Sequence, residues 1–242
     1  MRPCVDTMKV YAEVDPIGDE EKLARELRLL KSFDGLDLPD CPLGMPSMLP
    51  LAISARLRYA EDYSGRLIIN QRLADVNELY VRSLVLTSHV LSLDIAFTVG
   101  DAPKFGNAVN QLNSESALRI AKEYKANSRV GLFLSLRYPR EKIIERMRAG
   151  ADFFLAMRVR NASDLEGLEV SKIIPYVIIA TEKNKGIMDR IKQPAVTMDH
   201  LKDHIYELEG VGIRSVLLSC PGDWESLKNA LNFVGRKPDL RF

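Results

Sequence analysis

Short runs rich in β-branched and other apolar residues alternate with longer segments along almost the whole chain. Runs of this length and composition predict β-strands. In the segments between them, apolar residues recur every three or four positions, which predicts helices that bury one face. The eight predicted strands cover residues 9–15, 35–40, 66–72, 93–99, 129–136, 151–159, 173–180 and 213–219.

The helix signals are clearest in the segment that follows the first predicted strand. Asp19 stands before it as an N-cap residue, whose side chain accepts a hydrogen bond from a free backbone N–H group. Leu23, Leu27 and Leu30 then fall on one helical face. We therefore expect a helix that packs these leucines against the sheet.

Other helix ends carry equally local signals. Residues 75–78 match a capping box at the start of the third helical segment, and residues 161–164 begin another helix. Gly150 and Gly212 stand where helices are expected to end, because glycine readily adopts the left-handed conformation of a C-terminal cap. These signals place the predicted helices between consecutive strands.

Eight strands that alternate with helices are compatible with a closed barrel or an open doubly wound sheet. The strand count, the unbroken alternation and the length of 242 residues favour the barrel. No G-x-G-x-x-G follows the first predicted strand, so the usual dinucleotide-binding motif of the open sheet is absent. We predict an α/β protein in which residues 1–242 form a single (β/α)8 TIM barrel domain, with its ligand at the C-terminal ends of the strands.

The composition narrows the classes of partner. With 34 Lys and Arg against 33 Asp and Glu, the net charge is +1, which gives no global attraction to nucleic acid or to an anionic membrane. No run of about 18 apolar residues is present. Cys4, Cys41 and Cys220 include no C-x-x-C pair, which is typical of a reducing compartment. We predict a cytoplasmic protein that binds neither nucleic acid nor a membrane.

The first predicted strand carries the most informative acidic residue. The small apolar residues of the segment 9–15 alternate with Tyr11, Glu13 and Asp15. Because the apolar set suits the helix layer, we expect the other three side chains to point into the barrel. A carboxylate there is costly unless it is paired or protonated, so Glu13 is a candidate general acid with a raised pKa. The alternative is a structural ion pair between Glu13 and an inward-pointing Arg or Lys.

Two further pairs of residues end predicted strands, where barrels place functional groups. Gly100 and Asp101 follow the strand 93–99, and the glycine would let a ligand approach the backbone. An ordinary Gly-Asp turn is the alternative. Asn70 and Gln71 end the strand 66–72 and offer donors and acceptors to a planar heterocycle. Equally, they could satisfy backbone groups of a loop.

A metal site is not expected. His200 and His204 have the spacing of helical metal ligands and acidic neighbours. However, the apolar residues of the same segment form its core face, which predicts a solvated, salt-bridged flank for the two histidines. We therefore assign no metal ligands.

Taken together, several segments resemble the methylenetetrahydrofolate reductase family. The matching segments are AEVDP at residues 12–16, GLDLPDCPLGMPSMLPLAISARLR at 35–58, TVGDAPKFG at 98–106 and AGADFFLAM at 149–157. The likeness extends over nearly the whole chain, and its most specific parts are Glu13 in the first strand and the Gly-Asp after the fourth.

The resemblance implies a flavin-bearing barrel that passes a hydride from NAD(P)H through FAD to methylenetetrahydrofolate. By position, Glu13 matches the general acid that protonates the folate, and Asp101 matches the aspartate beside flavin and pterin. Arg146 matches a lysine that reaches the phosphates or ribose of FAD. With these residues, Asn70, Gln71 and Gly100 form the expected cofactor-binding set.

Several positions differ from the family pattern and keep alternatives open. Pro39 replaces a threonine after the second strand, Val99 an arginine, and Met157 a folate-contacting glutamine, and the segment that contacts the adenosine of FAD is missing. The alternatives are FMN in place of FAD, or a pterin-binding barrel without flavin that acts as a partner subunit in methyl transfer. A homo-oligomer is also compatible with the sequence. So is a structural relative with unrelated chemistry.

Overall fold

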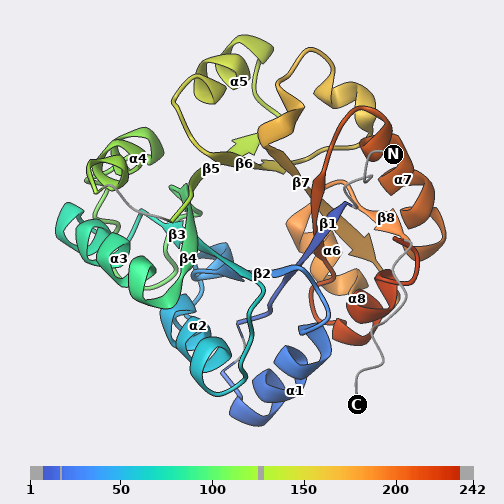
Figure 1. Cartoon of the computed structure of the whole chain (residues 1–242), viewed down its shortest axis with the longest axis horizontal. Coiled ribbons are helices and arrows are strands. Elements are labelled where there is room, and N and C mark those ends of the chain that lie inside the picture. The colour runs from blue at the N-terminus through green and yellow to red at the C-terminus, as the bar shows by residue number, and fades with distance from the viewer. Residues whose placement is uncertain (1–7, 17, 125–127, 235–242) are drawn as a thin grey trace, which may run out of the picture.

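Eight parallel strands close into a barrel in the computed structural model of this protein (Figure 1), which describes residues 8–16, 18–124 and 128–234. The barrel strands are β1 (Lys9–Glu13), β2 (Gly35–Pro39), β3 (Arg66–Arg72), β4 (Leu93–Thr98), β5 (Val130–Ser135), β6 (Phe153–Met157), β7 (Ile173–Ala180) and β9 (Ser215–Ser219). Strands β1 to β7 pair in chain order, and β9 pairs with both β7 and β1, which closes the ring. The predicted (β/α)8 barrel is therefore confirmed. A short strand that was not predicted, β8 (Val196–Thr197), pairs with β7 outside the barrel.

A ring of helices surrounds the barrel (Figure 1). The helices are α1 (Glu20–Leu30), α2 (Pro50–Tyr59), α3 (Glu78–Leu91), α4 (Ser114–Glu123), α5 (Arg140–Met147), α6 (Lys185–Ile191), α7 (Met198–Gly210) and α8 (Trp224–Ala230). Asp19 caps α1 as predicted, since its carboxylate accepts the Lys22 N–H group at 3.0 Å. No helix in the described ranges is long and apolar enough to cross a membrane.

The start of α3 differs from the predicted capping box. Asn77 is the N-cap residue, and its side chain accepts the Tyr80 N–H group at 3.0 Å. Asp75 instead forms an ion pair with Arg72, which lies inside the barrel and is 2% exposed. The buried guanidinium therefore takes the carboxylate that local sequence assigned to the cap.

The connection from β6 to β7 contains no α-helix, contrary to prediction. It holds two short 3-10 turns, Ala162–Leu165 and Val170–Lys172. The side chain of Asn161 accepts a hydrogen bond from Ser163 Oγ at 2.7 Å and caps no helix. Gly167 follows with φ 69°, which interrupts the segment before a second helical turn forms.

Helix α7 buries Leu201 and Ile205 as its pattern predicts. The prediction of a solvated flank is wrong for His204, which is buried, and burial lowers the pKa of its imidazole. His200 is exposed, with its Nδ1 2.9 Å from Thr197 Oγ1. In the described part of the chain, no group of three or more His, Cys, Asp or Glu side chains has metal-site geometry.

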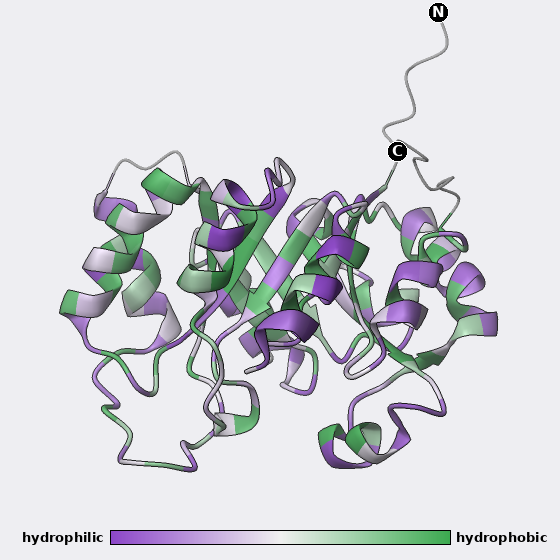
Figure 2. Cartoon of the chain, turned by 90° about the horizontal axis from the view of Figure 1, so that it is seen from below, coloured by the Kyte–Doolittle hydropathy of each residue, from purple (hydrophilic) through white to green (hydrophobic). Residues whose placement is uncertain are grey.

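Two apolar layers hold the barrel together. The outer layer lies between strands and helices, and Figure 2 shows the hydrophobic strands at the centre with more hydrophilic residues on the helices. The inner layer fills the barrel with side chains that alternate with the outer set along each strand. Its buried members are Tyr11, Ile68, Ala96, Phe153, Leu155, Ile174, Tyr176, Ile178 and Leu217.

Aromatic and cationic side chains pack together in the barrel interior around Phe153. The Arg66 guanidinium lies 5.0 Å from the centroid of the Phe153 ring and 5.5 Å from that of Tyr11, and it forms an ion pair with Asp94. Gly131 on β5 faces the same ring, and a Cβ atom there would lie 2.5 Å from it. The phenyl ring therefore occupies the space that a side chain at Gly131 would need.

Gly131→Ala is expected to destabilise the fold by about 1–3 kcal/mol, because the added methyl group overpacks the barrel interior. The free energy of unfolding in urea measures the effect. Gly186→Ala on α6 is the matched control, because no atom lies within 4 Å of its Cβ position and alanine favours helix. Equal stabilities of the two variants would contradict this packing.

Candidate functional site

A cavity of about 1310 Å³ opens at the C-terminal ends of the barrel strands. Ligand sites usually measure roughly 300–1,000 Å³, so this cavity has room for more than one ring system. Loops that follow the strands form its walls and project from the lower side of the barrel in Figure 2. Helix α6 contributes Ile187 and Ile191 to the lining and lies nearer the barrel axis than the other helices (Figure 1).

Glu13 lies at the end of β1 and lines this cavity. Its carboxyl group accepts a hydrogen bond from the Ser219 hydroxyl on β9 and another from Tyr176 on β7. Burial raises the pKa of Glu13 to about 7, the two hydroxyl contacts oppose that rise, and the negative charge of Asp15 adds to it. These contacts with hydroxyl groups differ from the ion pair that the structural alternative required.

Asp37 is a second carboxyl group beside Glu13, and the sequence analysis passed over it. The two residues are partners in the β1–β2 register, and Asp37 is fully buried. Asn70 Nδ2 donates to Asp37 Oδ2 at 2.6 Å, while Asp37 Oδ1 has no partner among the described residues. Burial raises the pKa of Asp37 well above its ordinary range, and the charge of Glu13 adds to the rise. A negative charge on Glu13 therefore disfavours ionisation of Asp37.

Asn70 and Gln71 point to opposite sides of β3. Asn70 lines the cavity, and its buried Oδ1 has no partner within the described ranges. Gln71 does not line the cavity; its Nε2 donates to Asp40 Oδ2 at 2.9 Å and to the Arg72 carbonyl at 2.6 Å. Of the two predicted cofactor ligands, the cavity therefore receives only Asn70, because successive side chains of a strand alternate between faces.

Gly100 and Asp101 lie on the rim of the same cavity. Gly100 has φ 82°, and a Cβ atom on it would lie 2.9 Å from both Cγ and Nη1 of Arg72. The absence of a side chain at Gly100 thus makes room for the Arg72 side chain, where the sequence analysis expected a ligand. Asp101 is exposed and faces the cavity mouth.

Arg146 of α5 also reaches the cavity. Its Nε donates to the Phe133 carbonyl at 2.6 Å, and its Nη1 lies 2.5 Å from Glu115 Oε1 on α4. The arginine is therefore held in place by neighbours before any ligand arrives. Glu13, Asn70, Gly100, Asp101 and Arg146 share one cavity, although they come from distant parts of the sequence.

Polar residues that the sequence analysis missed complete the cavity floor. Tyr176 and Ser219 both contact Glu13, and the same period-two alternation that selects Glu13 also turns Tyr176 inward from the apolar strand β7. That alternation in residues 35–39 also places Asp37 inside. The signal was present in the sequence, but it becomes meaningful only once the strands are known to neighbour one another.

Glu26 on α1 is a buried acid that holds the end of β1. It is fully buried, its Oε1 accepts the Asp15 N–H group at 2.8 Å, and its Oε2 has no partner in the described ranges. Burial raises the pKa of Glu26 to about 9; the bond from the Asp15 N–H opposes the rise, and the charges of Asp15 and Glu13 add to it. Asp15 in turn accepts Trp224 Nε1–H at 2.9 Å, which fixes the segment after Glu13.

The stability of the protein is expected to fall as pH rises from 6 to 8, and Glu26→Gln is expected to reduce that fall. The folded protein keeps the Glu26 proton up to about pH 9, whereas the unfolded chain loses it near 4.5. The stabilising contribution is therefore complete below pH 4.5 and is lost as pH rises, by up to about 1.4 kcal/mol per pH unit. Urea unfolding at both pH values tests this.

The control for that measurement is Glu21→Gln, an exposed residue on the same helix. Its difference in stability between pH 6 and pH 8 should equal that of the unaltered protein. A Glu26→Gln variant with the same pH dependence as the unaltered protein would show that Glu26 is already ionised in the folded state.

Neither a known protein family nor a curated protein matches this sequence, whereas many solved structures share its fold. One is an uncharacterized protein from Clostridium thermocellum that binds two copies of 5-methyl-5,6,7,8-tetrahydrofolic acid. It is 15% identical, the match covers 95% of this chain and 94% of that chain, and the TM-score is 0.69.

Two enzymes also share the architecture. An F420-dependent secondary alcohol dehydrogenase in complex with an F420-acetone adduct is 11% identical, with 96% of this chain and 100% of that chain covered and a TM-score of 0.66. Thiamine phosphate pyrophosphorylase from Pyrococcus furiosus is 13% identical, with 95% and 96% covered and a TM-score of 0.54. At these identities the likeness establishes that this chain shares the barrel fold with proteins of several activities.

Proposed function

We propose that this protein binds a reduced pterin of the folate class and reduces its methylene group to a methyl group with a flavin-type cofactor. The observation that carries the proposal is Glu13, a carboxyl group with a pKa of about 7 that contacts two hydroxyl groups at the floor of a large cavity. A general acid works best when its pKa lies near the working pH. The fold of this chain also occurs in a protein that binds methyltetrahydrofolate and in an F420-dependent enzyme.

The residues of the cavity fit a planar redox cofactor. Asn70 presents a buried oxygen that has no partner among the described residues and would accept an N–H group of the ring. Arg146 supplies a preorganised cation for an anionic part of the cofactor, and Asp101 lies at the mouth. A flavin bound here, FAD or the smaller FMN, would supply the hydride, with NAD(P)H as the proposed source of electrons.

In the proposed reaction, the protein itself supplies a proton to the substrate through Glu13. In its neutral form Glu13 would donate a proton to the ring nitrogen that leaves the methylene carbon, which opens the five-membered ring to an electrophilic iminium. Ser219 and Tyr176 hold the carboxyl in place, and burial, with the negative charge of Asp15, disfavours its ionisation. The proton at nitrogen and the hydride at carbon together convert the methylene group to a methyl group.

A second candidate is a pterin-binding barrel without flavin that serves as a partner subunit in methyl transfer. Two observations favour it. Gln71 faces away from the cavity, and Pro39, at the end of β2, offers no N–H or hydroxyl group to a cofactor. This candidate keeps Glu13 as a pterin ligand and removes the redox step.

Flavin retention separates the two candidates. We expect the freshly purified protein, or protein mixed with excess FAD or FMN and then desalted, to show flavin bands in its visible absorption spectrum. Protein that stays colourless after this treatment, yet is stabilised against heat by 5-methyltetrahydrofolate, would favour the partner subunit. Protein that neither retains flavin nor responds to the folate would contradict both.

Glu13→Gln is expected to lower the rate of methylene-pterin reduction by about 100-fold or more while both ligands still bind, because glutamine keeps the shape but cannot donate a proton as an acid. In the unaltered protein the rate should fall as pH rises through about 7, since Glu13 then loses its proton. Stopped-flow kinetics at several pH values measure both effects. Glu182→Gln, an exposed position outside the cavity lining, is the control. Unchanged turnover in Glu13→Gln would exclude the assigned role.

A further inference from the structure

Three arginines line the cavity near the ends of β5, β6 and β7. Arg137 follows β5, Arg158 follows β6, and Arg190 lies on α6, the helix after β7. The Leu136 N–H group donates to the Met157 carbonyl at 3.1 Å, so Arg137 and Arg158 each come directly after a hydrogen-bonded backbone pair. Arg158 Nη1 reaches the Lys192 carbonyl at 3.3 Å, two residues beyond Arg190. The three residues therefore share one section of the cavity wall, called here the arginine wall.

None of the three arginines forms an ion pair with a carboxylate of the described residues. Arg137 donates to the Tyr138 hydroxyl at 3.1 Å, and Arg158 and Arg190 each donate to a backbone carbonyl at 3.3 Å. Two other arginines that line the cavity differ, since Arg72 pairs with Asp75 and Arg146 with Glu115. The arginine wall thus presents three positive charges to the cavity that no described carboxylate neutralises through an ion pair, although the charge of Asp101 on the rim acts on Arg137 at longer range.

The backbone of Arg158 gives a second, independent observation. Its φ is 66°, in the left-handed region that residues with a side chain seldom adopt. Such strained positions cluster where function fixes the direction of a side chain. Arg158 is half-buried, and its side chain lines the cavity.

We propose that the arginine wall is an anion subsite, which binds the negatively charged tail of the ligand whose ring system lies beside Glu13. The proposal rests on the proposed function and specifies how the ligand is oriented. Planar guanidinium groups match carboxylate and phosphate oxygens in charge and geometry. The Glu13 carboxyl group at the cavity floor offers no positive charge to such a tail, so the arginine wall favours one orientation of the ligand. The shared chemistry is a multiply charged anion: the carboxylates of a glutamyl tail or the phosphate of a cofactor.

Sets of ligands with and without an anionic part test this subsite by isothermal titration calorimetry. One pair is 5-methyltetrahydropterin against 5-methyltetrahydrofolate with one and with three glutamates, and the other is riboflavin against FMN. The double variant Arg158→Gln, Arg190→Gln is expected to bind the anionic member of one pair about tenfold more weakly or worse, with the tail-free member unchanged. A higher salt concentration should also weaken the binding of this anionic ligand to the unaltered protein.

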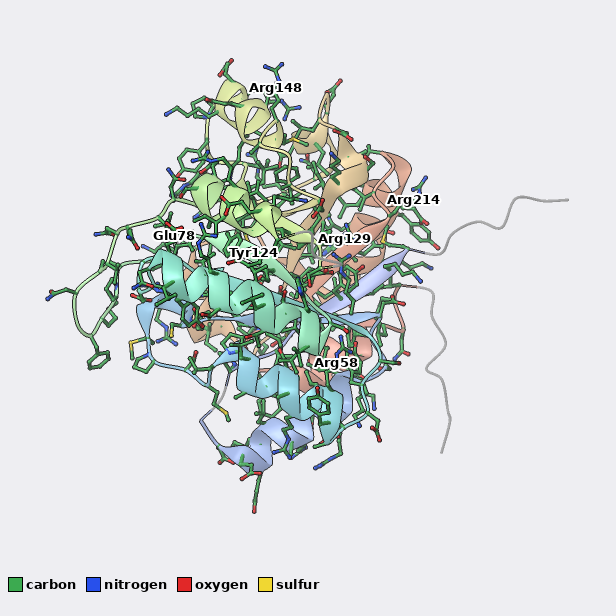
Figure 3. The ribbon with its side chains drawn as sticks, turned by 60° about the vertical axis from the view of Figure 1, so that its left-hand side comes forward. Arg58, Glu78, Tyr124, Arg129, Arg148 and Arg214 are labelled. Atoms are coloured by element: carbon green, nitrogen blue, oxygen red, sulfur yellow. The ribbon has the colours of Figure 1, made fainter. Side chains whose placement is uncertain are left out.

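The matched control is Arg148→Gln. Arg148 follows α5, is exposed, does not line the cavity, and points away from the barrel in Figure 3. The Arg148→Gln variant should bind every ligand with the same affinity as the unaltered protein. If the double variant does not fold, the single variants Arg137→Gln and Arg190→Gln, both at exposed positions, give the same comparison.

The two pairs identify the source of the anion. If the double variant selectively loses affinity for the glutamate-bearing folates, the subsite binds the carboxylate tail. If it selectively loses affinity for FMN, the subsite binds a phosphate. Equal losses for tail-free and anionic ligands, or no loss in either pair, would overturn the subsite.

Failure of the proposed function gives a different result, in which the unaltered protein binds none of these pterins or flavins. Inorganic pyrophosphate is then the probe. Saturable pyrophosphate binding that the double variant loses would retain the anion subsite without the pterin, and no binding to the unaltered protein would overturn it.

Discussion

Glu13 and Asp37 are neighbouring carboxyl groups inside a barrel, and their partners are hydroxyl and amide groups rather than cations. This constraint governs the C-terminal ends of the barrel strands, where the cavity lies. Charge is expensive there, so the pair retains protons that exposed carboxyls lose at lower pH. If the two acids served only the fold, apolar side chains of similar size would stabilise the barrel more at these positions. Glu13 lines the cavity, and its position beside the buried Asp37 is the physical basis for assigning chemistry to this end of the barrel.

Buried charge is instead neutralised near the N-terminal ends of the barrel strands. There Arg66 is compensated, since it pairs with Asp94 and stacks on the Tyr11 and Phe153 rings. Gly131 leaves the space that the phenyl ring fills. Part of the barrel therefore supplies packing and neutralised charge, which offsets the cost of unpaired acids near the cavity. This division matches the general separation of stability and function between the two ends of α/β barrels.

The cavity between these acids and the arginine wall is polarised. Its floor is acidic and proton-rich, and the wall formed by Arg137, Arg158 and Arg190 is cationic. Helix α6, inserted between β7 and the outer helix α7, supplies part of that wall, and the connection from β6 to β7 has no α-helix. An extended ligand with a neutral ring at one end and an anionic tail at the other fits such a field in one orientation.

The sequence by itself determined the eight strands, the inward direction of Glu13 and most of the helices, because periodicity and capping act between residues close in the chain. Only the tertiary structure decided which polar groups meet. Asp37 and Tyr176 become partners of Glu13 through strand pairing, and Gln71 turns away from the cavity although it adjoins Asn70. Burial, hydrogen bonding and charge between strands depend on contacts distant in sequence, and no local pattern encodes them.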